Sequence, residues 1–150
     1  MVPDQIEREI LIEAPVAKVW AAVTKAEHVG TWFGNAGATV ELRPGGDFSC
    51  TWRDGENLVT VHGLVEKVDE PHLFSFRWAR PPGTRPTVEN TTLVEFRLRG
   101  EGAATRLKVV ESGFRGLPKS DEDKLTQATQ NTEGWRRELA KLADYAPTLR

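Results

Sequence analysis

A chain of 150 residues falls within the usual size of one domain, so a single domain over residues 1–150 is expected. Hydrophobic residues make up 39%, charged residues make up 28%, and the net charge is -2, a composition that excludes a disordered chain. With 20 Lys and Arg against 22 Asp and Glu, no surplus of positive charge favours nucleic acid or a membrane surface as a partner.

The single cysteine and the N-terminal segment bear on the cellular compartment. Cys50 alone excludes an intramolecular disulfide and a multi-cysteine metal site, and it fits a reducing compartment. The first twelve residues alternate charged and apolar side chains and lack the apolar run of a secretion signal. No segment approaches the roughly 20 apolar residues of a membrane helix. The cytoplasm is the expected location, without a membrane span.

The first elements that the sequence predicts are a strand and two short helices. Residues 6–13 alternate isoleucine with glutamate, which is typical of a half-buried strand. Pro15 suits the first position of a helix, and residues 16–23 follow with apolar side chains on one helical face. Residues 27–33 predict a second short helix that ends in two aromatic residues.

The middle of the chain predicts a series of antiparallel strands separated by turn residues. Alternate positions carry large apolar side chains, while the intervening positions carry charges such as Arg77, Glu95 and Arg97. One face of the sheet is therefore expected to be buried and the other to be exposed to solvent. Residues 80–90, rich in proline, predict a loop at the rim. The predicted strands are residues 38–42, 47–52, 58–68, 73–79, 91–99 and 105–111.

The last segment predicts the longest helix. Ser120 can cap its start, three acidic residues follow, and no breaker occurs before Tyr145. Its side chains are small or polar in the first half of the face that should cover the sheet, so they leave space there. The predicted apolar face consists of Leu125, Ala128, Thr132, Trp135, Leu139 and Leu142.

This order of elements predicts an α+β fold in which a curved antiparallel sheet wraps around the long C-terminal helix. The two short helices after the first strand close one end. A cavity between helix and sheet follows, and aromatic residues on the inner face either fill the core or line an apolar ligand pocket. The candidate ligand-binding residues are Trp32, Phe33, Trp52, Phe76, Trp78, Phe96, Phe114, Thr132 and Trp135.

Few residues suggest chemistry. Glu111 continues the inner phase of its strand, so its carboxylate is predicted to point towards the cavity mouth, where it could act as an acid or base. The alternative is a strand-end glutamate in water or paired with an arginine. Cys50 is predicted to be a buried apolar filler with a raised pKa. The three histidines show no metal-ligand spacing and no nucleotide-binding motif occurs, so neither metal nor cofactor is expected.

Several short segments together resemble one known family. They are Ile10–Val16 with Val19 and Trp20, Trp32–Phe33, Gly45–Gly46, Gly63–Pro71 leading to Phe76–Trp78, Ser112–Phe114, and Gly134–Trp135. In these segments the chain resembles the START-like helix-grip superfamily (SRPBCC), and within it proteins similar to the C-terminal domain of the activator of heat shock protein 90 ATPase. The resemblance implies a helix-grip fold with an apolar cavity.

The resemblance leaves three functions open, because the superfamily includes lipid and polyketide binders, aromatase-cyclases and co-chaperone-like domains. The first is binding of a small apolar molecule, aromatic, lipid or polyketide-like. The second is a cyclase- or dehydratase-type enzyme that uses Glu111 in the same cavity. Members often carry a histidine at that place, just before the Ser-Gly-Phe stretch. The third is a co-chaperone-like module with a chaperone or other protein as its partner. The sequence does not indicate an oligomeric state.

Overall fold

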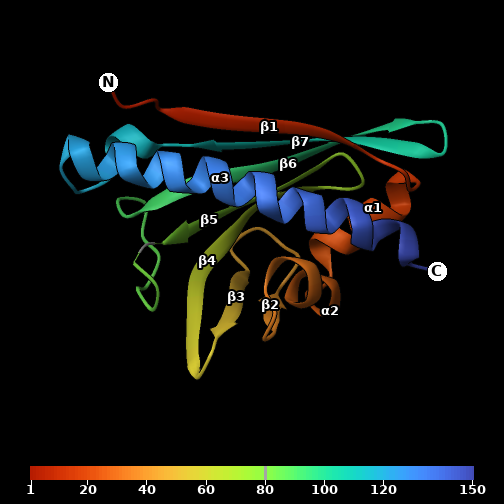
Figure 1. The fold of residues 1–150 in the computed structure, drawn as a ribbon, viewed down its shortest axis with the longest axis horizontal. Helices are drawn as coiled ribbons and strands as arrows, with labels where there is room; N and C mark the ends of the chain where they lie inside the picture. Colours follow the sequence, from red (N-terminus) through yellow and green to blue (C-terminus); the bar gives the residue numbers. More distant parts are fainter. Residues whose placement is uncertain (80) are drawn as a thin grey trace.

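The computed structural model describes residues 1–79 and 81–150, so Arg80 of the predicted loop lies outside the described residues. The chain forms a seven-stranded antiparallel sheet crossed by one long helix (Figure 1), which confirms the predicted helix-grip arrangement. The strands are β1 (Gln5–Ile12), β2 (Ala38–Val40), β3 (Asp47–Asp54), β4 (Asn57–Asp69), β5 (Leu73–Ala79), β6 (Thr91–Glu101) and β7 (Ala104–Ser112). The helices are α1 (Val16–Thr24), α2 (Ala26–His28) and α3 (Asp121–Tyr145), with a π-helical turn η1 (Val29–Phe33) and 3-10 turns η2 (Phe114–Gly116) and η3 (Ala146–Thr148).

The order of strands across the sheet is β1-β7-β6-β5-β4-β3-β2, so only β1 departs from the order of a simple meander. The first strand pairs with the last, with Gln5 opposite Ser112 and Ile12 opposite Thr105. Figure 1 shows α3 lying across one face of this sheet, with α1 and α2 gathered at the end nearest the C-terminus. The strand β2 is shorter than predicted, because the chain turns over residues 41–46.

The inner face of the sheet carries the large apolar side chains that the alternation predicted. Because the side-chain period of a strand is two, the pairing register sends every second residue towards α3. Phe48 stacks on Phe76 with ring centroids 3.9 Å apart, and Phe76 meets Phe96 at 5.8 Å. The predicted inner residues that are fully buried are Phe48, Cys50, Val61, Val65, Phe74, Phe76, Trp78, Val94, Phe96, Leu98, Leu107 and Val109.

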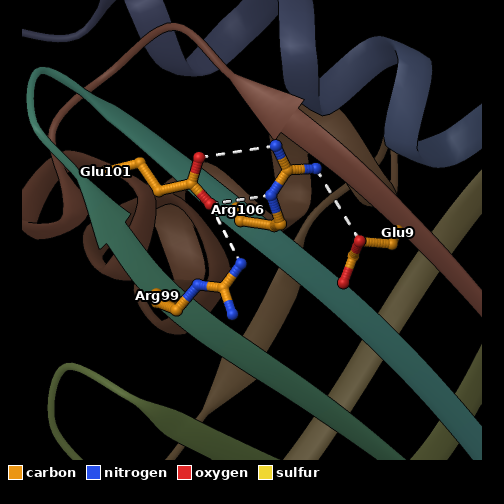
Figure 2. Close-up of polar contacts among 4 residues, drawn as sticks. All are labelled: Glu9, Arg99, Glu101 and Arg106. Atoms are coloured by element: carbon orange, nitrogen blue, oxygen red, sulfur yellow. Dashed lines mark hydrogen bonds and ion pairs between the residues drawn. The ribbon is translucent and has the colours of Figure 1, made fainter.

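The outer face of the sheet is covered by ion pairs. One group, which we call the Arg106 cluster, consists of Glu9, Arg99, Glu101 and Arg106 (Figure 2). Arg106 Nε donates to Glu101 Oε2 at 2.8 Å, and Arg99 Nη2 donates to the same oxygen at 3.0 Å. These hydrogen bonds lower the pKa of Glu101, and the bond to Glu101 raises the pKa of Arg106. The wet face predicted from the charges is therefore a face of paired charges.

Helix α3 begins as predicted, because Ser120 Oγ accepts from the backbone N–H of Asp123 at 3.1 Å. Its buried face differs from the predicted one. Leu125 is 43% exposed and Thr132 is also exposed, so both assignments were wrong. Asn131 faces inward in place of Thr132, held there by hydrogen bonds to Glu111. The residues of α3 that are fully buried are Ala128, Trp135, Leu139 and Leu142.

A second, smaller core lies under the start of α3. Phe114 is fully buried there with Val2, Leu117 and Ala128. The chain reaches this position through Gly113, whose φ of 98° is a left-handed conformation that favours glycine. The second core closes the end of the sheet where β1 starts and β7 stops. No helix in the described part of the chain is long and apolar enough to cross a lipid bilayer.

Candidate functional site

A cavity of about 690 Å³ lies between α3 and the sheet, within the range of 300–1,000 Å³ that is usual for small-molecule sites. Its walls come from η1, β3, β4, β5 and the middle of α3. The sheet side is apolar and the helix side is largely polar. The residues that line the cavity are Phe33, Trp52, Val59, Val61, Trp78, Thr129, Gln130, Asn131, Glu133, Gly134, Trp135, Arg137 and Glu138.

Four aromatic rings make one connected wall of the cavity. Phe33 stacks on Trp135 with centroids 5.4 Å apart and planes 6° from parallel, and on Trp78 at 5.6 Å. Trp52 and Phe33 make an edge-to-face contact with centroids 5.2 Å apart. The turn η1 positions Phe33, and Gly34 ends it where a Cβ atom would lie 2.6 Å from Cys50 Sγ. Phe33, Trp78 and Trp135 are 2%, 4% and 4% exposed and pack mainly against one another, so Trp52 is the half-buried ring of this apolar wall.

The helix side of the cavity contains open space at Gly134. A Cβ atom built on this glycine would meet no atom within 4 Å. The residue lies in the interior of α3, where glycine is unfavourable by about 1 kcal/mol relative to alanine. A side chain at this position would therefore start in the open space beside the cavity wall.

Behind the aromatic wall lies a fully buried carboxylate, Glu111, which is 0% exposed. Trp135 Nε1 donates to Oε1 at 2.9 Å, and Trp78 Nε1 donates to Oε2 at 2.9 Å. Thr92 Oγ1 donates to Oε2 at 2.5 Å, and Asn131 Nδ2 lies 3.1 Å from both oxygens. We call these five residues the Glu111 cluster. It joins the neighbouring strands β5, β6 and β7 to helix α3.

The position of Glu111 differs from the predicted one at the cavity mouth. Its side chain points inward as predicted, but Trp78, Asn131 and Trp135 line the cavity while the carboxylate lies behind them. In the described part of the chain no ion pair reaches Glu111, so its partners are neutral donors. Each of these four side chains donates to a carboxylate oxygen, so the cluster links three neighbouring strands to α3 behind the cavity wall.

The structure brings four of the nine ligand-binding candidates together at the cavity: Phe33, Trp52, Trp78 and Trp135. The other five lie outside the cavity lining. Trp32 is buried and donates to Ala22 O at 2.7 Å, Phe76 and Phe96 pack within the aromatic core, Phe114 lies in the second core, and Thr132 donates to Ala128 O at 2.8 Å on the exposed side of α3.

The other lining residues of the cavity were absent from the predicted ligand-binding set, among them Asn131, Gly134 and Glu138. These three are spaced three or four residues apart on α3 and flank Trp135, which is the signal that could have found them. The Glu138 side chain is only 16% exposed, and its Oε2 lies 2.6 Å from Lys141 Nζ. Burial raises the pKa of Glu138.

Cys50 is fully buried beside the cavity wall, and burial raises the pKa of its thiol to about 12. This confirms the predicted filler and removes the thiolate that a nucleophile needs. His28 Nδ1 lies 2.7 Å from the Tyr145 hydroxyl. Across residues 1–79 and 81–150, no three His, Cys, Asp or Glu side chains form a group that could hold a metal ion.

Comparison with known proteins places the chain in a family. The model of the family described as Activator of Hsp90 ATPase homolog 1-like protein matches residues 13–146. Among curated proteins no match is found.

Solved structures share the fold. Protein NE0264 from Nitrosomonas europaea is similar with a TM-score of 0.78 and 20% identity, covering 95% of this chain and 94% of that one. The Aha1 dimer from Colwellia psychrerythraea is similar with a TM-score of 0.71 and 18% identity, covering 96% of both chains. DynU16, a protein in the dynemicin biosynthetic locus, has a TM-score of 0.74 and 26% identity, and the match covers 97% of this chain and 48% of that one.

Proposed function

Because this chain belongs to the family of activator of Hsp90 ATPase homolog 1-like proteins, as its motifs predicted, we propose that it binds a small, largely apolar molecule between sheet and helix. The molecule is aromatic, lipid or polyketide-like. The observation that carries the proposal is the cavity of about 690 Å³ with four connected aromatic rings on its wall. The likeness to DynU16, from a biosynthetic locus, supports a small-molecule role.

The affinity for such a molecule can be estimated from the apolar area that it buries. A bicyclic aromatic molecule hides about 250 Å², which at about 25 cal/mol per Å² contributes about 6 kcal/mol. The net binding free energy is smaller than this, because the ligand loses translational and rotational freedom. We therefore expect dissociation constants weaker than about 40 μM, the value that corresponds to about 6 kcal/mol, for an unoptimised probe.

The test uses a variant that fills the cavity without disturbing the core. Gly134→Leu adds a side chain into open space and replaces an unfavourable helix residue. The matched control is Ala140→Leu, which adds the same side chain on the exposed side of α3. Titration with 2-methylnaphthalene, followed by tryptophan fluorescence, should saturate for the wild type and for Ala140→Leu. Gly134→Leu should bind at least tenfold more weakly; equal affinity would overturn the proposal.

A second candidate function, a cyclase- or dehydratase-type reaction in the same cavity, is favoured by one observation. Glu138 places a largely buried carboxyl group with a raised pKa on the cavity wall, where it can hold or move a proton. Glu111 is less suited, because every partner in its cluster donates to it. The test is exchange of the α-protons of 1-tetralone in D₂O, followed by NMR. Glu138→Gln should abolish protein-dependent exchange while sparing binding of 2-methylnaphthalene.

The co-chaperone-like alternative makes a separate prediction. The description of the family, which names the activator of Hsp90 ATPase, supports a protein partner. An activity of this kind uses a surface and does not need the cavity. Stimulation of the ATPase of purified Hsp90 by the wild type and by Gly134→Leu to the same extent would support this alternative, and no stimulation by either would count against it.

A further inference from the structure

We propose that Asn131 determines the specificity of the cavity and selects apolar molecules that carry an O–H or N–H donor, such as phenols. The inference rests on the proposed function, because it names the chemical class of ligand for the same cavity. Three observations carry it: the fixed direction of the Asn131 amide, the hydrogen bonding of its oxygen atom, and the surroundings of the other polar side chains on the wall.

The direction of the Asn131 amide is set by Glu111. The amide nitrogen Nδ2 lies 3.1 Å from both carboxylate oxygens. A carboxylate can only accept, so the amide must present its N–H groups to Glu111 and turn its oxygen away. The opposite orientation would bring the amide oxygen against two carboxylate oxygens. Glu111 cannot swing away, because Trp78, Trp135 and Thr92 hold it from three other sides.

The Asn131 oxygen remains available to a ligand. Among the described residues, both hydrogen bonds of the Asn131 side chain use Nδ2. The side chain is half-buried and lines the cavity. A carbonyl oxygen in such a partly dry place gains from any donor that a bound molecule brings, and a ligand without one leaves it unpaired.

The other polar side chains of the wall differ from Asn131. Those of Thr129, Gln130, Glu133 and Arg137 are exposed to water. Glu138, the other half-buried polar side chain, lies 2.6 Å from Lys141 Nζ. The indole N–H groups of Trp78 and Trp135 donate to Glu111, so neither is turned towards the cavity. Asn131 therefore offers a ligand a half-buried, neutral acceptor without an ion-pair partner.

The experiment compares two probes of similar size, 2-naphthol and 2-methoxynaphthalene, by titration of tryptophan fluorescence. We expect the wild type to bind 2-naphthol about tenfold more tightly, which corresponds to one net hydrogen bond. Asn131→Ala should lower this preference by about fivefold to tenfold. Thr132→Val is the matched control on the neighbouring residue, since its hydroxyl donates to Ala128 O outside the cavity; it should keep the wild-type preference.

A second variant tests the role of Glu111 in directing the amide. In Glu111→Gln the new amide can donate to Asn131 Oδ1 and so release Nδ2 towards the cavity. We expect its preference to shift towards 2-methoxynaphthalene, in protein whose far-ultraviolet circular dichroism matches the wild type. Equal preference in the wild type and in Asn131→Ala, with both probes bound, would overturn this inference alone. Failure of the wild type to bind either probe would overturn the proposed function as well.

Discussion

In the hairpin of β6 and β7, the carboxylates of Glu101 and Glu111 have opposite surroundings. Glu101, in the Arg106 cluster, has two arginines at hydrogen-bond distance on the outer face, and its side chain is 36% exposed (Figure 2). Glu111, in the Glu111 cluster, has no charged partner in the described part of the chain and is 0% exposed. Glu101 is exposed to solvent and forms ion pairs, whereas Glu111 is buried and is hydrogen-bonded only to neutral groups.

The difference indicates that the number of ion pairs a carboxylate forms does not measure its contribution to stability. An exposed ion pair contributes about 0–1 kcal/mol, because water and salt screen it. When a buried carboxylate is removed, its donors lose their acceptor. Each buried donor that is left unsatisfied costs about 1–3 kcal/mol. We therefore expect the Glu111 cluster to dominate stability although it contains a single formal charge.

The largest expected effect is that of Glu111→Ala. The substitution removes the acceptor of the Trp135 indole N–H, the Thr92 hydroxyl and the Asn131 amide, and it opens a void. Trp78 Nε1 keeps its hydrogen bond to Thr92 Oγ1 at 3.1 Å. The free energy of unfolding should fall by about 3–5 kcal/mol, a large part of the 5–15 kcal/mol typical of a domain. Urea denaturation measures it. The control Glu7→Ala removes an exposed carboxylate paired with Lys108 at 3.5 Å and should cost less than about 1 kcal/mol. Equal losses in the two variants would break the comparison.

An intermediate effect is expected when one donor of the Glu111 cluster is removed. Trp135→Phe keeps an aromatic ring but loses the N–H that donates to the carboxylate, a charge-assisted bond worth about 2 kcal/mol. Trp32→Phe is the matched control, because its N–H donates to the neutral carbonyl of Ala22, a bond worth about 1 kcal/mol. The comparison is sharpened if urea denaturation gives a lower free energy of unfolding for Trp135→Phe than for Trp32→Phe. The reverse order would contradict it.

The smallest effect is expected for Glu101→Gln, and it should depend on pH. Hydrogen bonds from Arg106 and Arg99 lower the pKa of Glu101 from its ordinary value of 4.5, so the ionised form favours the folded state. The contribution to stability is therefore present above pH 4.5 and lost as the pH falls through the lowered pKa. Thermal unfolding should show a small deficit for Glu101→Gln at pH 7 that shrinks as the pH falls below 4.5 and in high salt. A deficit that grows as the pH falls would contradict this origin.

The sheet could be predicted from the sequence because its signal is local. Phe74, Phe76 and Trp78 alternate with Ser75 and Arg77, and one face alone can accept the rings. The start of α3 was equally local, since Ser120 and Asp123 lie three residues apart. The resemblance to a family, carried by several short motifs, agreed with both and was confirmed by the family match.

The candidate site could be predicted only in part, because its geometry joins distant segments. The donors to Glu111 come from residues 78, 92, 131 and 135, and no spacing in the sequence announces that they meet. The choice between Asn131 and Thr132 had no local answer, since both lie at helical spacing from Ala128. Threonine resembles a core residue more than asparagine does, and only the buried carboxylate makes the amide the inward residue.

The pairing of β1 with β7 has a consequence for synthesis of the chain. The ribosome delivers residues 5–12 first, but their hydrogen-bonding partners are residues 105–112. Until that last strand emerges, the first strand has no place in the sheet, and α3 follows later still. Closing such a long loop is slow, and an unpaired strand edge is prone to aggregate while it waits. Folding during translation therefore stays incomplete until β7 has been synthesised. The sheet is completed only after that point.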